Sequence, residues 1–440
     1  MLHFGFTVTS MSTSTHAKSG NAGDGTPRVR IISGPLALVF LSLFGTLTSF
    51  YLLLSVTPMY AAAAGAGSAE AGLVTGVLLL GTVAAELAAS SLMNSFGYRK
   101  VLVAGAVLMG IPALALLSPG SLVTIVAVSV VRGLGFGLGT VATGALVAAL
   151  LPPERRGEGI GLASVVECGP AVVALPSGVW LAGHFGFGVV IGITAATALL
   201  PLAVLPWLPG PAGPRGTAPG AGAGQPVGLL AGLRLDGQLR LALIFAASTV
   251  AAGVVVSFLP LATGVSRNVA AAGLLAQALA ATVSSWWAGR RGDRHGHAGL
   301  LIPGLAIASA GMTVMIWLVF PVAVIAGMCL FGIGFGISQN AIFALMIERM
   351  PASGFGTASA LWSLAYDAGY GAGPAVFGLF AGRTGYPAAF ALTGVLMIAA
   401  LPAAWRERSA AAVSRAGSES TRAGLRGRGR RTREFRRAGR

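Results

Sequence analysis

The sequence predicts an all-α polytopic membrane protein, with twelve transmembrane helices arranged as two pseudo-symmetric six-helix bundles. Three observations predict this class: an apolar composition, a series of long apolar runs and an internal repeat. Of the 440 residues, 55% are hydrophobic and only 10% are charged, whereas an ordinary soluble domain has about 25% charged residues. A chain of this composition cannot build a polar surface all round, so much of it must face lipid.

The apolar runs are long enough to cross a bilayer. A helix spans the hydrocarbon core, roughly 30 Å thick, in about 20 residues, because it satisfies its own backbone hydrogen bonds there. Twelve runs meet that requirement. They lie near residues 34–58, 71–93, 101–118, 121–150, 159–182, 187–208, 239–264, 268–289, 299–319, 321–346, 356–381 and 386–405.

These runs divide the chain into five parts. The parts are a polar tail at 1–33, a six-helix bundle at 34–208, a Pro/Gly-rich linker at 209–238, a second six-helix bundle at 239–405 and an Arg-rich tail at 406–440. We expect the first tail and the linker to be flexible, because their polar, Gly-rich composition gives no core-forming pattern. The first tail also lacks the short apolar core and cleavage site of a signal peptide.

The distribution of basic residues predicts the orientation. If both termini are cytoplasmic, all but three of the 29 Lys and Arg residues lie on the inner side. Arg267 and Arg383 fall in outer loops, and Arg132 lies within a span. Because short cytoplasmic loops collect basic residues, we expect cytoplasmic termini. The Ala-, Gly- and Arg-rich composition is typical of a GC-rich bacterial genome. We therefore expect the protein in a bacterial inner membrane.

An internal repeat relates the two bundles at an offset of 199 residues. Four matches fall in register: Gly133-Leu-Gly-Phe-Gly137 with Gly332-Ile-Gly-Phe-Gly336, Pro152 with Pro351, Gly183-His-Phe-Gly186 with Gly382-Arg-Thr-Gly385, and Asn94 with Asp293. Repeated halves with a binding site between them are a recurring plan of transporters.

A loop signature follows the second span of each half. It comprises Gly289, Asp293, Arg294 and Gly296 in the second half, and Ser90, Asn94, Gly97, Arg99 and Lys100 in the first. With these loops and the repeat, the chain resembles the major facilitator superfamily of secondary transporters between its two tails. The family pattern is Gly-x-x-x-Asp-Arg-x-Gly-Arg-Arg, and the first-half copy departs from it at the Gly and the Asp. The resemblance implies that these loops favour one of two alternating states.

Two other features support the resemblance. The loop with Pro152, Arg155, Arg156, Gly157 and Glu158 is typical of the family between its fourth and fifth helices. The pairs Gly169-Pro170 and Gly373-Pro374 resemble fragments of the glycine-proline motif of its drug antiporters. Proline within a span removes one backbone hydrogen bond, and small neighbours permit a bend. These pairs are therefore candidate hinges.

Four ionisable residues lie deep within predicted spans: Glu86, Glu167, Asp367 and Arg132. A charge there costs at least about 2.5–3.5 kcal/mol. A carboxyl group at this depth is therefore expected to exchange a proton as water gains or loses access to it. These four residues are the candidates for proton coupling, with Asp367 foremost.

A purely structural role is the alternative for three of these four residues. Glu86 and Arg132 are also compatible with a static ion pair within the first half. Asp367 is also compatible with a helix-packing hydrogen bond near Gln339 and Asn340 on the tenth span.

Uncharged polar residues within the spans are candidates for solute contact. They are Ser42, Thr46 and Ser49 on the first span, Gln339 and Asn340 on the tenth, and Trp362, Ser363, Tyr366 and Tyr370 on the eleventh. Aromatic rings beside the Asp367 carboxylate suit a cationic or amphiphilic ligand. The alternative is that these side chains only bond neighbouring helices.

Other kinds of site find no support in the sequence. The histidines and the two cysteines, Cys168 and Cys329, form no metal-ligand set or nucleophilic triad, and no glycine-rich phosphate loop with a lysine is present. We therefore expect no enzyme activity, no metal and no cofactor. The Arg-rich tail is expected to approach anionic lipid headgroups rather than nucleic acid.

The sequence thus favours a monomeric secondary transporter that moves a small solute by alternating access. Buried carboxyl groups and the partial Gly-Pro motifs favour proton-coupled efflux of a drug-like or metabolite solute. One alternative is a proton symporter or facilitator that imports a sugar or an organic acid. Another is a membrane sensor or scaffold without transport, which the retained repeat and the polar spans disfavour.

Overall fold

The computed structural model describes residues 34–118, 121–150, 156–207, 229–235, 237–262, 264–351 and 354–409. Residues 1–33, most of the predicted linker and residues 410–440 of the Arg-rich tail lie outside this range, as do Pro152 and Arg155. Within the described residues, all regular secondary structure is helical.

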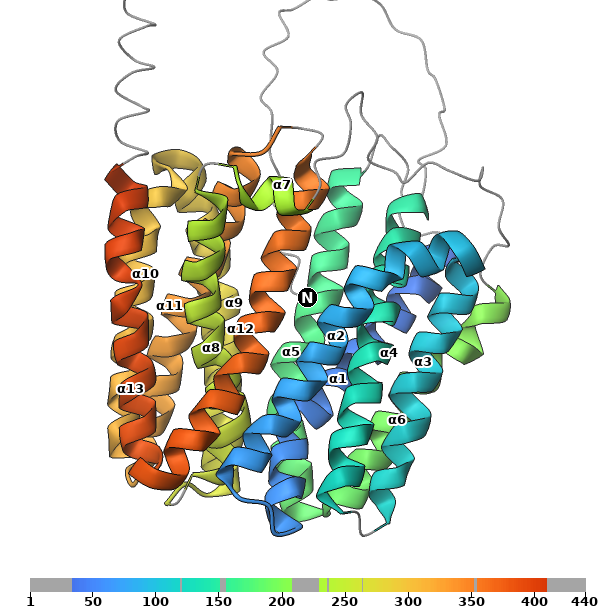
Figure 1. Cartoon of the computed structure of the whole chain (residues 1–440), viewed down its shortest axis with the longest axis horizontal. Helices are drawn as coiled ribbons and strands as arrows, with labels where there is room; N and C mark the ends of the chain where they lie inside the picture. Colours follow the sequence, from blue (N-terminus) through green and yellow to red (C-terminus); the bar gives the residue numbers. More distant parts are fainter. Residues whose placement is uncertain are drawn as a thin grey trace, which may run out of the picture.

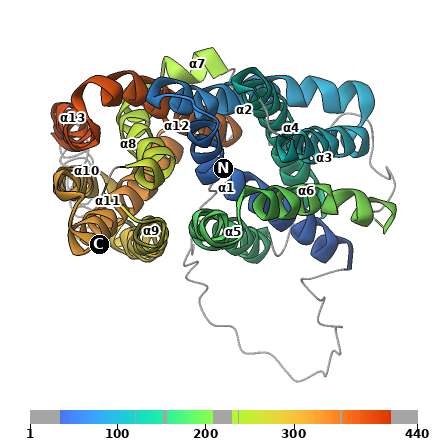
Figure 2. The same ribbon diagram turned by 90° about the horizontal axis from the view of Figure 1, so that it is seen from below.

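Two groups of six long helices make up the fold (Figure 1). The N-half contains α1 (Gly34–Ala63), α2 (Ser68–Phe96), α3 (Tyr98–Leu114), α4 (Leu122–Leu150), α5 (Arg156–His184) and α6 (Phe187–Val204). The C-half contains α8 (Gln238–Phe258), α9 (Arg267–His295), α10 (Leu301–Val314), α11 (Pro321–Glu348), α12 (Phe355–Thr384) and α13 (Tyr386–Ala399). Seen from below, the groups lie side by side, with α2 next to α12 and α5 next to α9 (Figure 2).

The helices have the length and apolarity of membrane spans, as the sequence predicts. Among the described residues, 11 helices qualify by both measures. The twelfth long helix, α12, has 30 residues but carries Ser363, Asp367 and two tyrosines, which lower its hydropathy. The last span extends to Ser409, beyond its predicted end at 405. A short helix that the sequence did not predict, α7 (Leu229–Leu233), lies within the linker.

The repeat is visible in the backbone as pairs of glycines with positive φ at the predicted offset. The pairs are Gly65 and Gly264 (φ 93° and 87°), Gly97 and Gly296 (80° and 88°), and Gly186 and Gly385 (84° and 78°). Side chains rarely adopt this conformation, so glycine is favoured at each turn. Gly97 and Gly296 lie at the end of the bundle that carries α7, which we call the linker face. The other pairs turn at the opposite end, the far face.

The repeated glycine motif has a packing role in both halves. A Cβ atom added at Gly133 would overlap the carbonyl oxygen of Leu78, and one added at Gly332 would overlap that of Gln277. Leu78 and Gln277 are themselves separated by 199 residues. The motif therefore allows α4 to approach α2, and α11 to approach α9, backbone to backbone.

A seam between α2 and α12 joins the two halves towards the far face. Thr75 Oγ1 lies 3.0 Å from Ser257 Oγ of α8, and Ser68 Oγ lies 3.3 Å from the Tyr386 hydroxyl. A Cβ atom at Gly72 would overlap the carbonyl oxygen of Pro374. Hydrogen bonds and close backbone packing thus hold α2 against α8 and α12 towards the far face.

Candidate functional site

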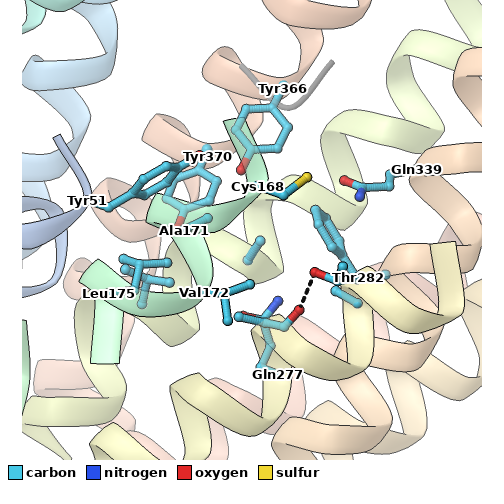
Figure 3. Close-up of a pocket in the computed structure, with 15 residues that line it drawn as sticks. Tyr51, Cys168, Ala171, Val172, Leu175, Gln277, Thr282, Gln339, Tyr366 and Tyr370 are labelled. Atoms are coloured by element: carbon cyan, nitrogen blue, oxygen red, sulfur yellow. Dashed lines mark hydrogen bonds between the residues drawn. The ribbon is translucent and has the colours of Figure 1, made fainter. Parts of the chain in front are cut away.

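A cavity of about 50 Å³ lies between the halves (Figure 3). In this conformation it has room for a few water molecules. Helices α1 and α5 of the N-half and α8, α9, α11 and α12 of the C-half contribute its lining. The polar groups in that lining are Tyr51, Cys168, Gln277, Thr282, Gln339, Tyr366 and Tyr370.

An aromatic column on α12 forms one wall of the cavity. The ring centroids of Trp362 and Tyr366 lie 5.7 Å apart, and those of Tyr366 and Tyr370 lie 5.4 Å apart, both stacked. Spacings of four residues place the three rings on one helix face. The two tyrosines line the cavity, whereas Trp362 packs at 4.9 Å against Phe245 outside the lining.

Two further polar groups face the cavity from the C-half. The hydroxyl of Thr282 donates to the carbonyl oxygen of Ala278 at 2.8 Å, so its oxygen remains available only as an acceptor. Gln339 is 1% exposed, and its Oε1 has no hydrogen-bond partner among the described residues. In Figure 3 this amide and the Tyr366 hydroxyl point towards the thiol of Cys168.

A pair of carboxyl groups bridges the two halves. The side chain of Glu86 on α2 lies next to that of Asp367 on α12. Asp367 is buried, and Glu86 Oε1 and Asp367 Oδ2 have no partner among the described residues. Two neighbouring carboxyl groups can form a hydrogen bond when one of them carries a proton. The pair is therefore a candidate proton site between the halves.

The other two ionisable candidates lie elsewhere. Arg132 is 3% exposed and donates to the carbonyl oxygens of Met109 at 2.6 Å and Ser49 at 3.1 Å. It ties α4 to α3 and α1, and the ion pair with Glu86 that the sequence left open does not form. Glu167 is half-buried, next to the cavity residue Cys168.

The candidates on α1 lie away from the cavity. A Cβ atom at Gly139 of α4 would lie 3.7 Å from the methyl group of Thr46, and Ser49 bonds to Arg132. Ser42 is also buried, and none of the three is part of the lining. The α1 residue that does line the cavity is Tyr51. The prediction for the other three was wrong because Ser and Thr within a membrane helix serve helix packing as readily as solute binding.

The remaining substrate candidates are buried beside the cavity. Gln339, Tyr366 and Tyr370 line it, whereas Asn340, Trp362 and Ser363 do not. Asn340 Nδ2 donates to Ser285 Oγ at 3.4 Å, and Ser363 Oγ has no partner among the described residues. No hydrogen bond joins Asp367 to Gln339 or Asn340 among the described residues, and Asp367 Oδ2 has no partner there.

The two candidate hinges occupy different surroundings. Pro170 and Pro374 both lie within helices, α5 and α12. A Cβ atom at Gly373 would overlap the carbonyl oxygen of Val250 in α8, whereas one at Gly169 would make an ordinary contact at 3.6 Å with Phe44. The pair on α12 therefore belongs to a tightly packed seam.

The predicted switch loops lie at the linker face, each within its own half. Asp293 is exposed, with Oδ1 3.7 Å from His297 Nε2, and the other nitrogen of that ring lies 2.8 Å from Glu348. Arg294, Asn94 and Lys100 are exposed, while Gly289 is buried.

Four polar residues of the lining were not predicted from the sequence: Tyr51, Cys168, Gln277 and Thr282. The candidates predicted from the sequence were buried charges and the uncharged polar residues of three spans. Gln277 could have been predicted, because an amide side chain within an apolar span indicates a candidate site in the same way as a charged one. Tyr51 and Cys168 carried none, since an aromatic ring or a thiol is common in any apolar helix.

Two repeated six-helix groups around a central cavity are typical of a polytopic membrane transporter. The family model of the Major Facilitator Superfamily matches residues 39–366 and 278–438. The chain belongs to the Major Facilitator Superfamily and is therefore a transporter of small solutes rather than an enzyme.

Solved structures show the same fold. A bacterial homolog of the human lysosomal transporter Spinster, in an inward-facing and unoccupied conformation, superimposes with a TM-score of 0.69 at 17% identity, covering 86% of this chain and 98% of that one. A mutant of the nucleoside transporter NupG gives a TM-score of 0.65 at 12% identity, covering 84% and 99%. No curated protein sequence matches the chain at a significant level.

Proposed function

We propose that the chain is a proton-coupled antiporter that exports a drug-like or metabolite solute by alternating access. The observation that carries this proposal is the proximity of the Glu86 and Asp367 carboxyl groups across the two halves. Each half contributes one carboxyl group, so the proposed shared proton bond is made and broken as the halves rock. The cavity beside it is the proposed solute site.

The closed seam supports the direction of coupling. Thr75, Ser257 and Gly72 hold the far face closed while the carboxyl pair shares its proton. Loss of that proton leaves two like charges in contact, which repel each other. Release of the proton at the linker face therefore favours separation of α2 from α12 and opening of the far face. A proton arriving from the far side restores the closed seam, so proton entry is exchanged for solute exit.

This cycle requires that the linker face is cytoplasmic, in a bacterial inner membrane. The basic residues support this orientation, because Arg234, Arg240, Arg349 and Arg406 all belong to that face. The transport unit in the proposal is a monomer, since the cavity and the carboxyl pair are both complete within one chain.

Transport into inverted membrane vesicles tests the proposal. The solute panel includes lipophilic cations, organic acids, sugars and a nucleoside, the last because one structural neighbour is described as a nucleoside transporter. We expect one class to accumulate when the lumen is acidic, and a protonophore to abolish the accumulation. Accumulation in right-side-out vesicles with an acidic exterior would instead establish the alternative, a proton symporter that imports its solute.

A further inference from the structure

The hydrogen-bonding groups of the cavity are distributed unequally between the halves. Gln277 of α9 corresponds through the repeat to Leu78 of α2, and Tyr370 of α12 corresponds to Ala171 of α5. The fold is the same on both sides, so it does not require these polar groups in the C-half. Their presence there indicates a ligand that is held mainly by the C-half.

The N-half contributes a largely apolar wall. Ala171, Val172 and Leu175 of α5 line the cavity opposite the amides of α9 and α11. A molecule bound between these walls once they move apart would present one apolar side and one hydrogen-bonding edge. The tyrosine rings of α12 add flat apolar surfaces on which a ring system can stack.

Gln339 supplies the second observation that points to a ligand. Its side chain is 1% exposed, lines the cavity and leaves Oε1 without a partner among the described residues. A buried acceptor without a donor is unfavourable, and native structures rarely leave one unexplained. A donor on a bound solute would satisfy it, while the NH₂ group of the same amide can serve an adjacent acceptor.

The lining favours an uncharged ligand. None of the described lining residues is acidic or basic. Asp367 is engaged with Glu86, and Glu167 lies outside the lining, next to Cys168. The lining residues themselves offer a charged solute no opposite charge to replace its hydration, which makes direct binding to them unfavourable.

We infer that the transported solute is an uncharged nitrogen heterocycle with an amide-like edge, on which a donor and an acceptor are adjacent. Gln339 and Gln277 bind that edge, because a carboxamide forms a two-point hydrogen bond with such a group. Tyr366 and Tyr370 contact the ring. This inference rests on the proposed function, and it replaces the cationic or amphiphilic ligand that the sequence favoured.

The thiol of Cys168, which lines the cavity, can report whether a ligand is bound there. The chain has only two cysteines, so the Cys329→Ser variant leaves the cavity residue Cys168 as its single thiol. The rate at which N-ethylmaleimide alkylates this thiol is measured in the purified protein with and without three probes. The probes are uridine (a neutral heterocycle with an amide edge), tetraphenylphosphonium (a lipophilic cation) and benzoate (an anion).

We expect uridine at millimolar concentration to slow alkylation, and the two charged probes to have no effect. Gln339→Ala or Gln277→Ala should weaken the protection by uridine about tenfold or more. The matched control is Thr140→Ala, since Thr140 is the repeat counterpart of Gln339 and its hydroxyl bonds Phe136 and Gly137 instead. This control should leave the protection unchanged.

The inference fails if a charged probe protects better than uridine, if uridine gives no protection, or if its protection survives both glutamine substitutions. These outcomes are separable from failure of the proposed function. Proton-driven accumulation of tetraphenylphosphonium would contradict the solute class and leave antiport intact. Protection by uridine without any response to a pH gradient would support the solute class and contradict proton coupling.

Discussion

Glu86 on α2 and Asp367 on α12 lie next to each other although they belong to different halves of the molecule. In the proposed cycle, rocking of the halves separates the two carboxyl groups, and the groups approach again when one of them carries a proton. The proposal therefore links proton occupancy and the closed seam through one contact.

Asp367→Asn should uncouple transport from the pH gradient. Asparagine keeps the size of the side chain and a hydrogen bond to Glu86 but cannot release a proton. Accumulation in vesicles should fall to the level of equilibration, while exchange of solute without a gradient persists. The control is Arg383→Gln at the exposed end of α12. If Asp367→Asn still drives uphill transport near the original rate, the coupling belongs to Glu167 or the protein uses no protons.

Gly72→Ala should prevent the far face from closing. The added Cβ atom would overlap the carbonyl oxygen of Pro374, and such overpacking costs about 1–3 kcal/mol. That energy shifts the balance of states roughly 5- to 150-fold towards the far-face-open state. In whole cells of a Cys329→Ser background, an impermeant thiol reagent should then modify Cys168 faster.

The matched control for this substitution is Gly192→Ala on α6, where an added Cβ atom has nothing within 4 Å. Both changes add one methyl group to a membrane helix, so a general effect of helix propensity is the same in each. Equal labelling rates in the two variants would show that the contact between Gly72 and Pro374 does not control the far face.

The sequence predicted the helices well because each span must satisfy its own backbone in lipid, which makes its pattern local. The repeat could also be predicted, because Gly133 and Gly332 recur at the same offset. Each is required by a backbone contact that a side chain would block. The contact between Glu86 and Asp367 could not be predicted from the sequence. It joins residues 281 positions apart in sequence through the packing of two halves, and no local pattern specifies that packing.

The faces of the helices were harder to predict than their ends. Thr46 and Ser49 on α1 have the same polarity as a cavity residue but pack towards α4, while Tyr51 faces the cavity. An α-helix surrounded by other helices is apolar on every side, so periodicity does not distinguish a cavity face from a packing face. Only the arrangement of neighbouring helices decides which polar groups meet a solute.

Arg132→Met should destabilise the N-half without uncoupling transport. The guanidinium group bonds the carbonyl oxygens of Met109 and Ser49 and so holds three helices together. Loss of these bonds should reduce the free energy of unfolding by about 1–3 kcal/mol, measured by denaturation in detergent. The exposed Lys100→Gln serves as control. If Arg132→Met is stable but transports without response to the pH gradient, Arg132 has a role in coupling.

The last prediction concerns Glu407, which is 1% exposed at the linker face. Its carboxylate accepts a hydrogen bond from Arg349 and forms an ion pair with Arg240 at 3.0 Å, so it fixes the end of the last span to α8 and α11. Glu407→Gln removes the charge that compensates both arginines, and we expect the free energy of unfolding to fall by about 1–3 kcal/mol. The two arginines should contribute unequally, because Arg349 is 24% exposed and Arg240 is 42% exposed. Solvent screens the more exposed pair, so Arg240→Gln should cost only about 0–1 kcal/mol.

The control for this series is Arg408→Gln, which alters an exposed neighbour on the same helical turn. Denaturation in detergent should rank Glu407→Gln as the most destabilising, followed by Arg349→Gln and then Arg240→Gln, with the control unchanged. The double variant Glu407→Gln, Arg349→Gln should lose less than the sum of the single losses, because the two residues share one interaction. Strictly additive losses would show that Glu407 does not hold the last span through Arg349.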